Sequence, residues 1–335
     1  MDGRAKRRVV VTGGAGYVGS ALVPDLLRSG HRVEVIDLFW FGEEVFGEYN
    51  RHPNLGRHHV DIRDTDAVRS AMHGADAVIH LACISNDPSY ELDPRLSKSI
   101  NYDCFGGLVR AAAEAGAERF IYASSSSVYG VKDEPDVTED AVPAPLTDYS
   151  KYKLACERDL WAMDCGTMRR VVVRPATVCG YANRLRLDLT VQILTIHALV
   201  NKRIRVFGGS QLRPNIHIRD MVRAYRHLLD ESPERIDGQT FNVGFQNRSV
   251  AEIAALVAST IGDAAVTIVT EPTNDMRSYH VNSDKIDRVL GFRPRHSIEE
   301  AVADLQKAYA DGCILDPLTN PAYSNIETVR RLVSA

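Results

Sequence analysis

A tyrosine and a lysine four residues apart, Tyr149 and Lys153, are the side chains of this sequence best suited to move a proton. On a helix, that spacing places the phenol and the ammonium side by side on one face. A free phenol has a pKa of about 10, so it is a poor base at neutral pH unless a nearby cation stabilises the phenolate. Of the thirteen tyrosines, only Tyr149 has a lysine at the fourth following position. The pair predicts acid–base chemistry, although such a pair by itself is also common on a solvated helix surface.

A run of four serines, Ser124 to Ser127, follows an expected strand at 119–123. A serine hydroxyl both donates and accepts hydrogen bonds, so one of these groups can share a substrate oxygen with Tyr149. The same run is also typical of a plain polar turn. The serines alone do not decide between the two interpretations.

A glycine-rich turn near the N-terminus predicts a dinucleotide site. Gly13, Gly16 and Gly19 follow a buried apolar strand and open an apolar-patterned helix. A missing Cβ permits a tight turn at the first glycine, close approach of a diphosphate at the second, and close packing of helix and strand at the third. Free N–H groups at the helix start then face the phosphates. Tyr17 and Val18, between the second and third glycines, are expected to contact the cofactor as well.

An acid at the end of the second expected strand indicates which dinucleotide is bound. Asp37 ends the segment 30–37, near the roughly 20-residue spacing expected for a carboxylate that holds the adenosine ribose diol. Its charge would also repel a 2′-phosphate. We therefore expect NAD rather than NADP, the alternative being an ordinary strand-ending aspartate.

Strands and helices alternate over roughly the first 180 residues. This rhythm predicts an α/β fold built on a doubly wound parallel Rossmann sheet. The expected elements are strands at 58–61, 75–82, 119–123 and 169–174, separated by helical stretches such as 64–72 and 101–115.

Ligands of such sheets bind beyond the carboxyl ends of the strands. At two of these ends, Asp61 and Ile62 can reach an adenine ring, and Leu81, Ala82 and Cys83 can line the cofactor trough. All five are equally compatible with plain sheet core.

After Gly180 the sequence predicts a smaller, substrate-binding lobe. A long helical pattern covers 183–202, a short strand is expected at 204–208, and Pro, Asn and Gly recur between shorter elements. The segment 240–244 is expected to return to the first lobe. We therefore expect an NAD-binding domain over 1–180, with a returning segment near 238–246, and an interleaved substrate lobe over 181–335. No function is assigned to 316–335.

Two arginines of the second lobe, Arg213 and Arg277, have the chemistry to hold phosphate groups. A guanidinium presents a planar fork of donors that suits a diphosphate-bearing substrate. Surface arginines without a ligand are the ordinary alternative.

Composition limits the other classes of function. The net charge is −4, and no basic block follows the first eight residues, so nucleic acid is not an expected partner. No stretch approaches 18 uninterrupted apolar residues, so no membrane span is expected. The six cysteines are scattered without metal-ligand spacing, which favours reduced thiols in a cytoplasmic protein and no metal site.

Together these motifs resemble those of the extended short-chain dehydrogenase/reductase family, in its nucleotide-sugar epimerase and dehydratase branch. The resemblance runs from Val9 to about Ala303 and includes the glycine turn, Asp37 and the Tyr149–Lys153 pair. It implies NAD as cofactor and a nucleotide-diphosphate sugar as substrate.

The resemblance also implies roles for single residues. It makes Ser125 catalytic with Tyr149 and Lys153. It adds Asn101, Tyr149, Lys153 and Pro175 to the cofactor-binding residues. It places Ser125, Ser126, Thr177, Arg213 and Arg277 at the substrate, although Thr177 stands where many relatives carry an asparagine.

The reaction type is inferred from the serine segment. Dehydratases of this branch have Asp-Glu after the catalytic Thr, and decarboxylases keep the glutamate, whereas this chain has Ser126 and Ser127. A hydroxyl at 127 resembles the 4-epimerases. We therefore expect NAD-dependent epimerisation at C4 through a transient 4-keto sugar. The alternatives are a nucleotide-sugar 4,6-dehydratase, an NAD-dependent dehydrogenase or reductase of a nucleotide sugar, and a non-catalytic NAD-binding regulator.

A homodimer is a further expectation from the resemblance. Relatives commonly pair through the helix that holds Tyr149 and the one that begins near Asn101. The apolar residues available for such a contact, which can instead pack onto the sheet, are Leu108, Val109, Leu154 and Leu160.

Overall fold

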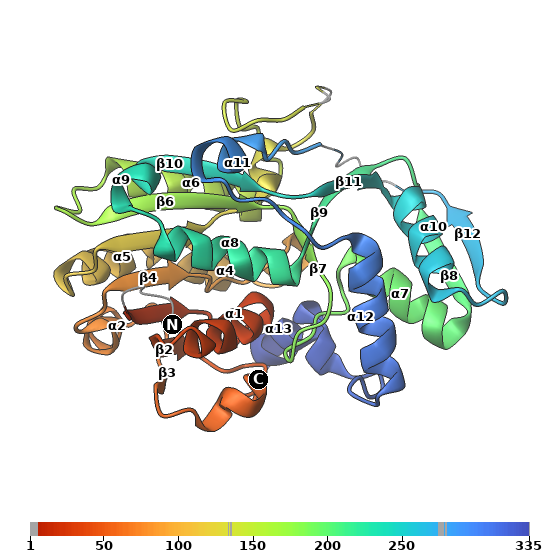
Figure 1. Ribbon diagram of the computed structural model, residues 1–335, viewed down its shortest axis with the longest axis horizontal. Coiled ribbons are helices and arrows are strands. Elements are labelled where there is room, and N and C mark those ends of the chain that lie inside the picture. Colours follow the sequence, from red (N-terminus) through yellow and green to blue (C-terminus); the bar gives the residue numbers. More distant parts are fainter. Residues whose placement is uncertain (1–5, 133, 135, 274–277, 279, 335) are drawn as a thin grey trace.

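The computed structural model describes residues 6–132, 134, 136–273, 278 and 280–334. At its centre is a seven-stranded parallel sheet in the order β10-β6-β5-β4-β1-β2-β3 (Figure 1). The strands are β1 (Arg8–Thr12), β2 (Arg32–Asp37), β3 (Leu55–His59), β4 (Ala77–His80), β5 (Arg119–Ala123), β6 (Arg169–Pro175) and β10 (Gln239–Val243). The predicted doubly wound parallel sheet is therefore confirmed.

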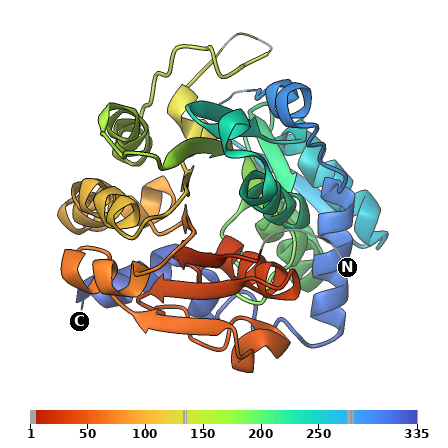
Figure 2. The ribbon, with the colours of Figure 1, turned by 60° about the vertical axis from the view of Figure 1, so that its left-hand side comes forward.

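Helices cover both faces of this sheet, as Figure 2 shows. Val9 and Val11 pack with α1 (Tyr17–Arg28) and α8 (Ile218–Asp230). Val10, between them, packs on the opposite face with α2 (Thr65–Met72) and α5 (Phe105–Glu114). Because neighbouring side chains of a strand point to opposite faces, a strand buried on both sides must be apolar throughout. This requirement explains the continuous valine run at the start of the sheet.

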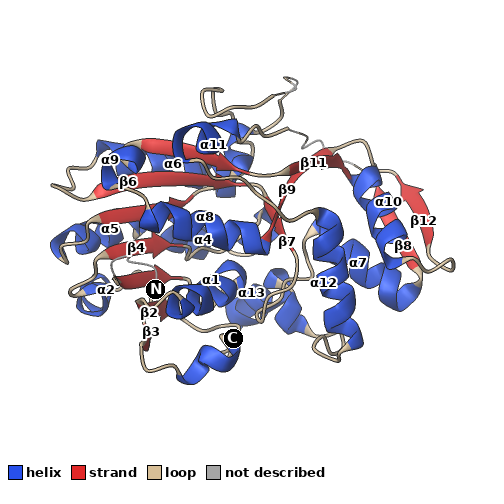
Figure 3. Ribbon diagram, in the orientation of Figure 1, coloured by secondary structure: helices blue, strands red, loops and turns tan. Residues whose placement is uncertain are grey.

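The second lobe consists of two small sheets and a helical layer (Figure 3). One sheet has the order β11-β9-β7 and the other pairs β12 with β8. Apolar side chains of α7, α10 and α12 form its core. The elements are β7 (Thr177–Cys179), β8 (Arg203–Phe207), β9 (Leu212–His217), β11 (Gln246–Ser249), β12 (Thr267–Glu271), α7 (Thr190–Asn201), α10 (Val250–Ile261) and α12 (Ile298–Ala310).

Shorter elements and the helix that carries Tyr149 and Lys153 complete the chain. These are α3 (Asp87–Tyr90), α4 (Pro94–Lys98), α6 (Asp148–Ala162), α9 (Pro233–Ile236), α11 (Asp284–Leu290), α13 (Asn325–Ser334), the 3₁₀ turns η1 (Gly47–Arg51), η3 (Ser126–Tyr129) and η4 (Pro321–Tyr323), and the π-helical turn η2 (Ser99–Asp103).

The segment predicted to return does so, because β10 pairs in parallel with β6 at the edge of the central sheet. Two helix predictions were wrong in extent. The stretch 101–115 begins inside the π-helical turn and continues as α5, and the pattern over 183–202 forms a helix only from Thr190. Residues 183–189 stay non-helical, and Arg184 and Arg186 within them make polar contacts with distant parts of the chain. The spacing of apolar residues within one segment carries no information about contacts with distant residues, so it could not predict where the helix begins.

The last helix, α13, packs back onto the first lobe rather than extending the second. It lies beside α3. Val329 is buried in the apolar cluster that also holds Val10 and Leu108. The division at residue 180 remains a prediction, and the structure adds that the C-terminal segment contacts the N-terminal lobe.

The apolar residues suggested for a dimer contact lie within the chain's own core. Leu108, Val109 and Leu160 belong to the cluster on one face of the sheet, and Leu154 is buried beside Val128. They therefore pack internally, which was the alternative, and the homodimer stays a prediction. Among the described residues, no helix combines the length and the apolar character that crossing a bilayer requires.

Candidate active site

A cavity of about 370 Å³ lies where the ends of the six strands β1 to β6 meet. It is lined by loops that follow these strands and by the first residues of α6 and of the last helix. The predicted site residues that line it are Gly13, Gly16, Tyr17, Val18, Gly19, Asp37, Asp61, Ile62, Leu81, Ala82, Cys83, Ser125, Ser126, Tyr149, Lys153, Pro175 and Thr177.

The glycine turn is closed by contacts that a side chain would block. Gly13 has a φ of +71°, and a Cβ there would lie 2.5 Å from the backbone nitrogen of Ala82. A Cβ on Gly19 would lie 2.3 Å from the carbonyl oxygen of Gly14. Both distances are below any real Cβ contact, so both positions require glycine. The third glycine thus packs against the turn itself rather than against the strand.

Asp37 ends β2 with its carboxylate at the cavity wall. One oxygen accepts the N–H of Ala15 at 2.9 Å, and the other accepts the N–H of Phe39 at 2.8 Å. Burial raises the pKa of this carboxyl, and the backbone hydrogen bonds act in the opposite direction. Each oxygen has a further lone pair, so the group can accept hydrogen bonds from a ribose diol.

Tyr149 and Lys153 both lie on α6 and face the cavity, as their spacing predicted. Thr147 fixes the start of this helix through a capping box with Ser150. The Lys153 ammonium donates to the carbonyl oxygen of Ala123 at 2.7 Å and lies 5.9 Å from the centre of the Tyr149 ring. The helix thus holds a buried cation beside the phenol.

The electrostatic surroundings of Tyr149 include a residue that the sequence did not single out. Burial, followed by Cys83 and Asp87, raises the pKa of Tyr149 well above its ordinary value. Arg186 and a hydrogen bond with Ser125 act in the opposite direction. The cationic environment of the phenol is therefore shared between Lys153 and Arg186, which comes from the loop before α7.

The serine run divides into groups with different surroundings. The Ser124 hydroxyl donates to buried Glu157. Ser125 caps the short η3 turn, and its oxygen accepts hydrogen bonds from the N–H of Ser127 at 3.1 Å and from its hydroxyl at 2.9 Å. All four serines line the cavity, so the run is more than a polar turn.

Three residues predicted for the site are not among the described residues that line the cavity. Asn101 does not line the cavity, and its amide accepts from the N–H of Ile84 and donates to its carbonyl, which holds the loop after β4. Arg213 lies half-buried on β9, outside the cavity lining. Arg277 lies outside the described residues.

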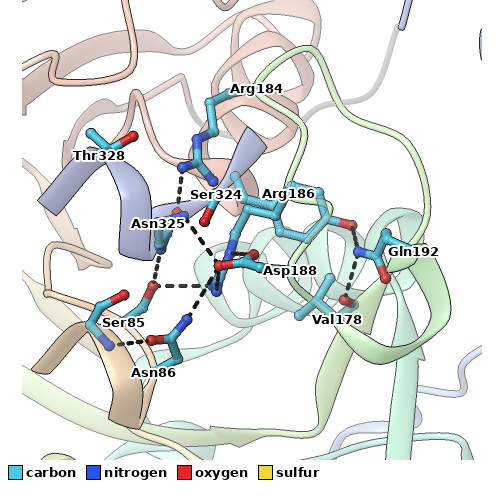
Figure 4. A network of polar contacts seen from close by, with 12 residues as sticks. Ser85, Asn86, Val178, Arg184, Arg186, Asp188, Gln192, Ser324, Asn325 and Thr328 are labelled. Carbon is cyan, nitrogen blue, oxygen red and sulfur yellow. Dashed lines mark hydrogen bonds and ion pairs between the residues drawn. The ribbon is translucent and has the colours of Figure 1, made fainter. Parts of the chain in front are cut away.

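Sequence reasoning missed several lining residues: Trp40, Phe41, Ser85, Arg184, Arg186, Tyr225 and Asn325. The arginines follow no strand end directly, and Asn325 belongs to the segment without an assigned function. Trp40 and Phe41 follow the end of β2, and Ser85 follows the end of β4, so the strand-end rule could have included these three. Arg184, Arg186 and Asn325 reach the cavity only through tertiary contacts (Figure 4).

Buried His80, the last residue of β4, should make the folded protein less stable at acidic pH. Its Nδ1 lies 2.6 Å from the hydroxyl of Thr12, and burial, followed by Lys153, lowers its pKa from 6.5 to about 3. Folded His80 therefore stays neutral where the unfolded chain takes up a proton. Neutral His80 therefore contributes fully to the free energy of unfolding above pH 6.5, and this contribution is lost as the pH falls toward 3.

Urea unfolding between pH 7 and pH 4.5 should show a smaller loss of stability in His80→Gln than in the wild type. The matched control is His73→Gln, because His73 is already exposed to solvent and should not change the acid response. Parallel pH profiles for His80→Gln and the wild type would contradict the assignment.

The residues present fit a dinucleotide. The glycine turn leaves its backbone accessible, the Asp37 carboxylate lies at the end of β2, and a buried arginine, Arg184, lines the same cavity. These features match the ribose and phosphate groups of such a ligand in charge and hydrogen-bonding type.

Comparison with known proteins places this architecture among characterised enzymes. The model of a family described as "NAD dependent epimerase/dehydratase family" matches residues 9–244. A UDP-glucose 4-epimerase from Lactobacillus helveticus is 25% identical over 323 residues, which covers 90% of this chain and 96% of the relative. A UDP-glucuronic acid decarboxylase 1 from Xenopus tropicalis is also 25% identical, over 90% of this chain and 72% of that protein.

Solved structures show the same arrangement of elements. MoeE5 in complex with UDP-glucuronic acid and NAD superimposes with a TM-score of 0.79 at 27% identity, covering 91% of this chain and 99% of the other.

Proposed function

Because the chain belongs to the NAD dependent epimerase/dehydratase family and uses NAD as its cofactor, we propose that it epimerises a nucleotide-linked sugar at C4 through a transient 4-keto intermediate. The observation that carries the choice of reaction is the distribution of carboxylates. The only carboxylates among the described lining residues are Asp37 and Asp61, at the ends of β2 and β3. The serine hydroxyls that line the cavity near Tyr149 cannot replace the acids that sugar dehydration requires at C5 and C6. Asp87, whose charge raises the pKa of Tyr149, accepts a hydrogen bond from Thr147 and lies outside the cavity lining.

Each catalytic residue has a defined task in this proposal. Tyr149 accepts the proton of the C4 hydroxyl and later returns it. Lys153 and Arg186 supply the positive charge that stabilises the phenolate during this transfer. Ser125 donates a hydrogen bond to the C4 oxygen as it becomes a ketone.

When bound, NAD supplies a nicotinamide ring that can accept the C4 hydrogen as hydride and give it back. The chain's residues must therefore keep the keto sugar in the cavity while it presents its opposite face. Ser126 and Thr177 line the cavity and are proposed to hold the sugar. Arg213 and Arg277 are proposed to hold the nucleotide diphosphate. We propose that the other predicted lining residues hold the cofactor: Gly13, Gly16, Tyr17, Val18, Gly19, Asp37, Asp61, Ile62, Leu81, Ala82, Cys83 and Pro175. Asn101 contributes indirectly, because it fixes the loop at Ile84.

Conversion of a UDP-sugar without added cofactor tests the proposal. The purified protein is incubated with UDP-glucose or UDP-glucuronic acid in deuterated water, and the sugar is followed by proton NMR. We expect the C4 epimer, no deuterium on the sugar ring and no accumulating NADH, because the hydride leaves and returns within one turnover.

Other outcomes separate the alternatives. A dehydratase would form a 4-keto-6-deoxy sugar and introduce deuterium during elimination. A dehydrogenase would require added NAD and accumulate NADH steadily. Either result would contradict C4 epimerisation, and failure to convert any sugar would favour a non-catalytic NAD-binding protein. Size-exclusion chromatography with light scattering tests the proposed homodimer.

A further inference from the structure

Arg184 is a buried cation at the cavity wall that has no carboxylate partner within ion-pair distance among the described residues. Only 4% of the residue is exposed, and its Nε has no hydrogen-bond partner. Its neighbour Arg186, by contrast, pairs with Asp188 at 2.9 Å. Asp188 and Asp37 partly offset the burial of this charge without forming an ion pair with it. A buried charge without a paired counterion is costly, so this arrangement indicates a site that an anion completes.

The position of Arg184 identifies the part of the cavity that it serves. Its backbone N–H donates to the Ser20 hydroxyl in the first turn of α1 at 3.1 Å. Its guanidinium carbon lies 3.6 Å from the centre of the Phe41 ring, which also lines the cavity. The start of α1 follows the glycine turn, where helix N–H groups already favour a phosphate. The backbone of Arg184 thus lies beside the first turn of α1, and its side chain belongs to the same cavity as the glycine turn.

The orientation of Arg184 depends on the far end of the chain. Its Nη2 donates to the side-chain oxygen of Asn325, the first residue of α13 (Figure 4). Asn325 is itself fixed, because its amide nitrogen donates to the Ser85 hydroxyl at 2.6 Å and its backbone N–H donates to Asp188 at 3.1 Å. An amide oxygen orients a guanidinium without neutralising it, which leaves the positive charge for a ligand.

We propose that Arg184 binds the diphosphate of NAD and that Asn325 positions it, so that the C-terminal helix is part of the cofactor site. Arginine suits this role because its planar donors match phosphate oxygens. The 2′-phosphate of NADP is a poorer candidate, because the Asp37 carboxylate lies in the same cavity and would repel it. The proposal rests on NAD as the cofactor and is independent of the reaction at the sugar.

Calorimetric titration of the cofactor-free protein with NAD, NADP, ADP and adenosine tests the role of Arg184. Arg184→Ala should weaken NAD and ADP binding by about 10- to 100-fold, the range expected for a lost hydrogen bond between charged groups. Adenosine, which has no phosphate, should bind as it does to the wild type. Arg184→Lys keeps the charge but not the fork, so its affinity for ADP should lie between the two.

Asn325→Asp tests the positioning role without removing the tail. An aspartate keeps the contact with Arg184 but neutralises its charge, so ADP and NAD should bind more weakly although thermal stability is maintained. A role in folding alone predicts the opposite, namely unchanged or tighter nucleotide binding. Arg331→Ala, an exposed position on the same helix, is the matched control and should leave binding unchanged.

Three results would overturn the proposal. The first is an equal loss of adenosine and ADP affinity in Arg184→Ala and Arg184→Lys, which would indicate a structural role. The second is wild-type ADP binding by Asn325→Asp. The third is a loss confined to NADP, which would assign Arg184 to a 2′-phosphate. Because no sugar is present, these results are independent of whether the protein is an epimerase.

Discussion

Replacement of Tyr149 by phenylalanine should lower kcat for sugar conversion by about 10²- to 10⁴-fold, the usual contribution of a positioned acid–base group. The substitution removes a single oxygen from a ring that is fixed on α6 beside Lys153. The glycine turn and Asp37 are unaffected, so NAD should remain bound. The measurement combines steady-state kinetics with the NAD content of the purified protein.

Tyr152→Phe is the matched control for this experiment. Tyr152 lies on the same helix, where it stacks with Tyr90 and Tyr102, and it does not line the cavity. It should keep wild-type turnover. If Tyr149→Phe also kept full activity, Tyr149 would not be the proton acceptor, and the proposed mechanism would have to be abandoned.

Glu157→Ala should destabilise the protein by about 3–5 kcal/mol, the loss expected when one member of a buried ion pair is removed. Glu157 accepts two hydrogen bonds from Arg174, at 3.0 and 2.6 Å, and one from Ser124. Both charged residues are nearly fully buried. Without Glu157, the Arg174 guanidinium would remain inside the protein without a counterion.

The expected loss extends beyond one contact, because Arg174 joins several elements. Its Nη1 donates to the Tyr129 hydroxyl at 2.9 Å, which in turn donates to Asn242 on β10 at 2.7 Å. The network thus connects α6, η3 and the sheet strands β6 and β10 behind the serine run. Urea unfolding followed by circular dichroism measures the effect.

Two further variants test whether the loss of stability comes from the buried charge. Glu114→Ala removes an exposed ion pair with Arg69 and should leave the urea midpoint nearly unchanged, because solvent screens such pairs. The double substitution Glu157→Met with Arg174→Met should recover much of the lost stability, since no buried charge is left. If Glu157→Ala unfolded at the wild-type urea concentration, the buried pair would not be a major source of stability.

The sequence predicted the parts of the site that depend on short segments. The turn from β1 to α1 requires glycine at 13 and 19 for contacts that appear in the structure, and the spacing of Tyr149 and Lys153 places both on one face of α6. The alternation of elements predicted the parallel sheet, which in turn brings strand ends into one cavity. The assignment of single residues to cofactor and substrate remains a prediction for the experiments above.

The predictions that failed depended on contacts between distant residues. The apolar spacing over 183–202 is compatible with one long helix, but the structure is non-helical before Thr190 and places Arg184 and Arg186 at the cavity. Asn325 lies 141 positions from Arg184 along the chain, and no local pattern announces their contact.

By itself, then, the sequence determined the central sheet, the glycine turn and the Tyr149–Lys153 face, because each follows from backbone geometry and apolar periodicity within one or two neighbouring elements. Only the tertiary structure decided that the C-terminal helix returns to the cavity and that Arg184, which forms no ion pair within the described part of the chain, faces it. The physical reason is that burial and charge pairing depend on every group that surrounds a side chain, and those groups come from segments far apart in the chain.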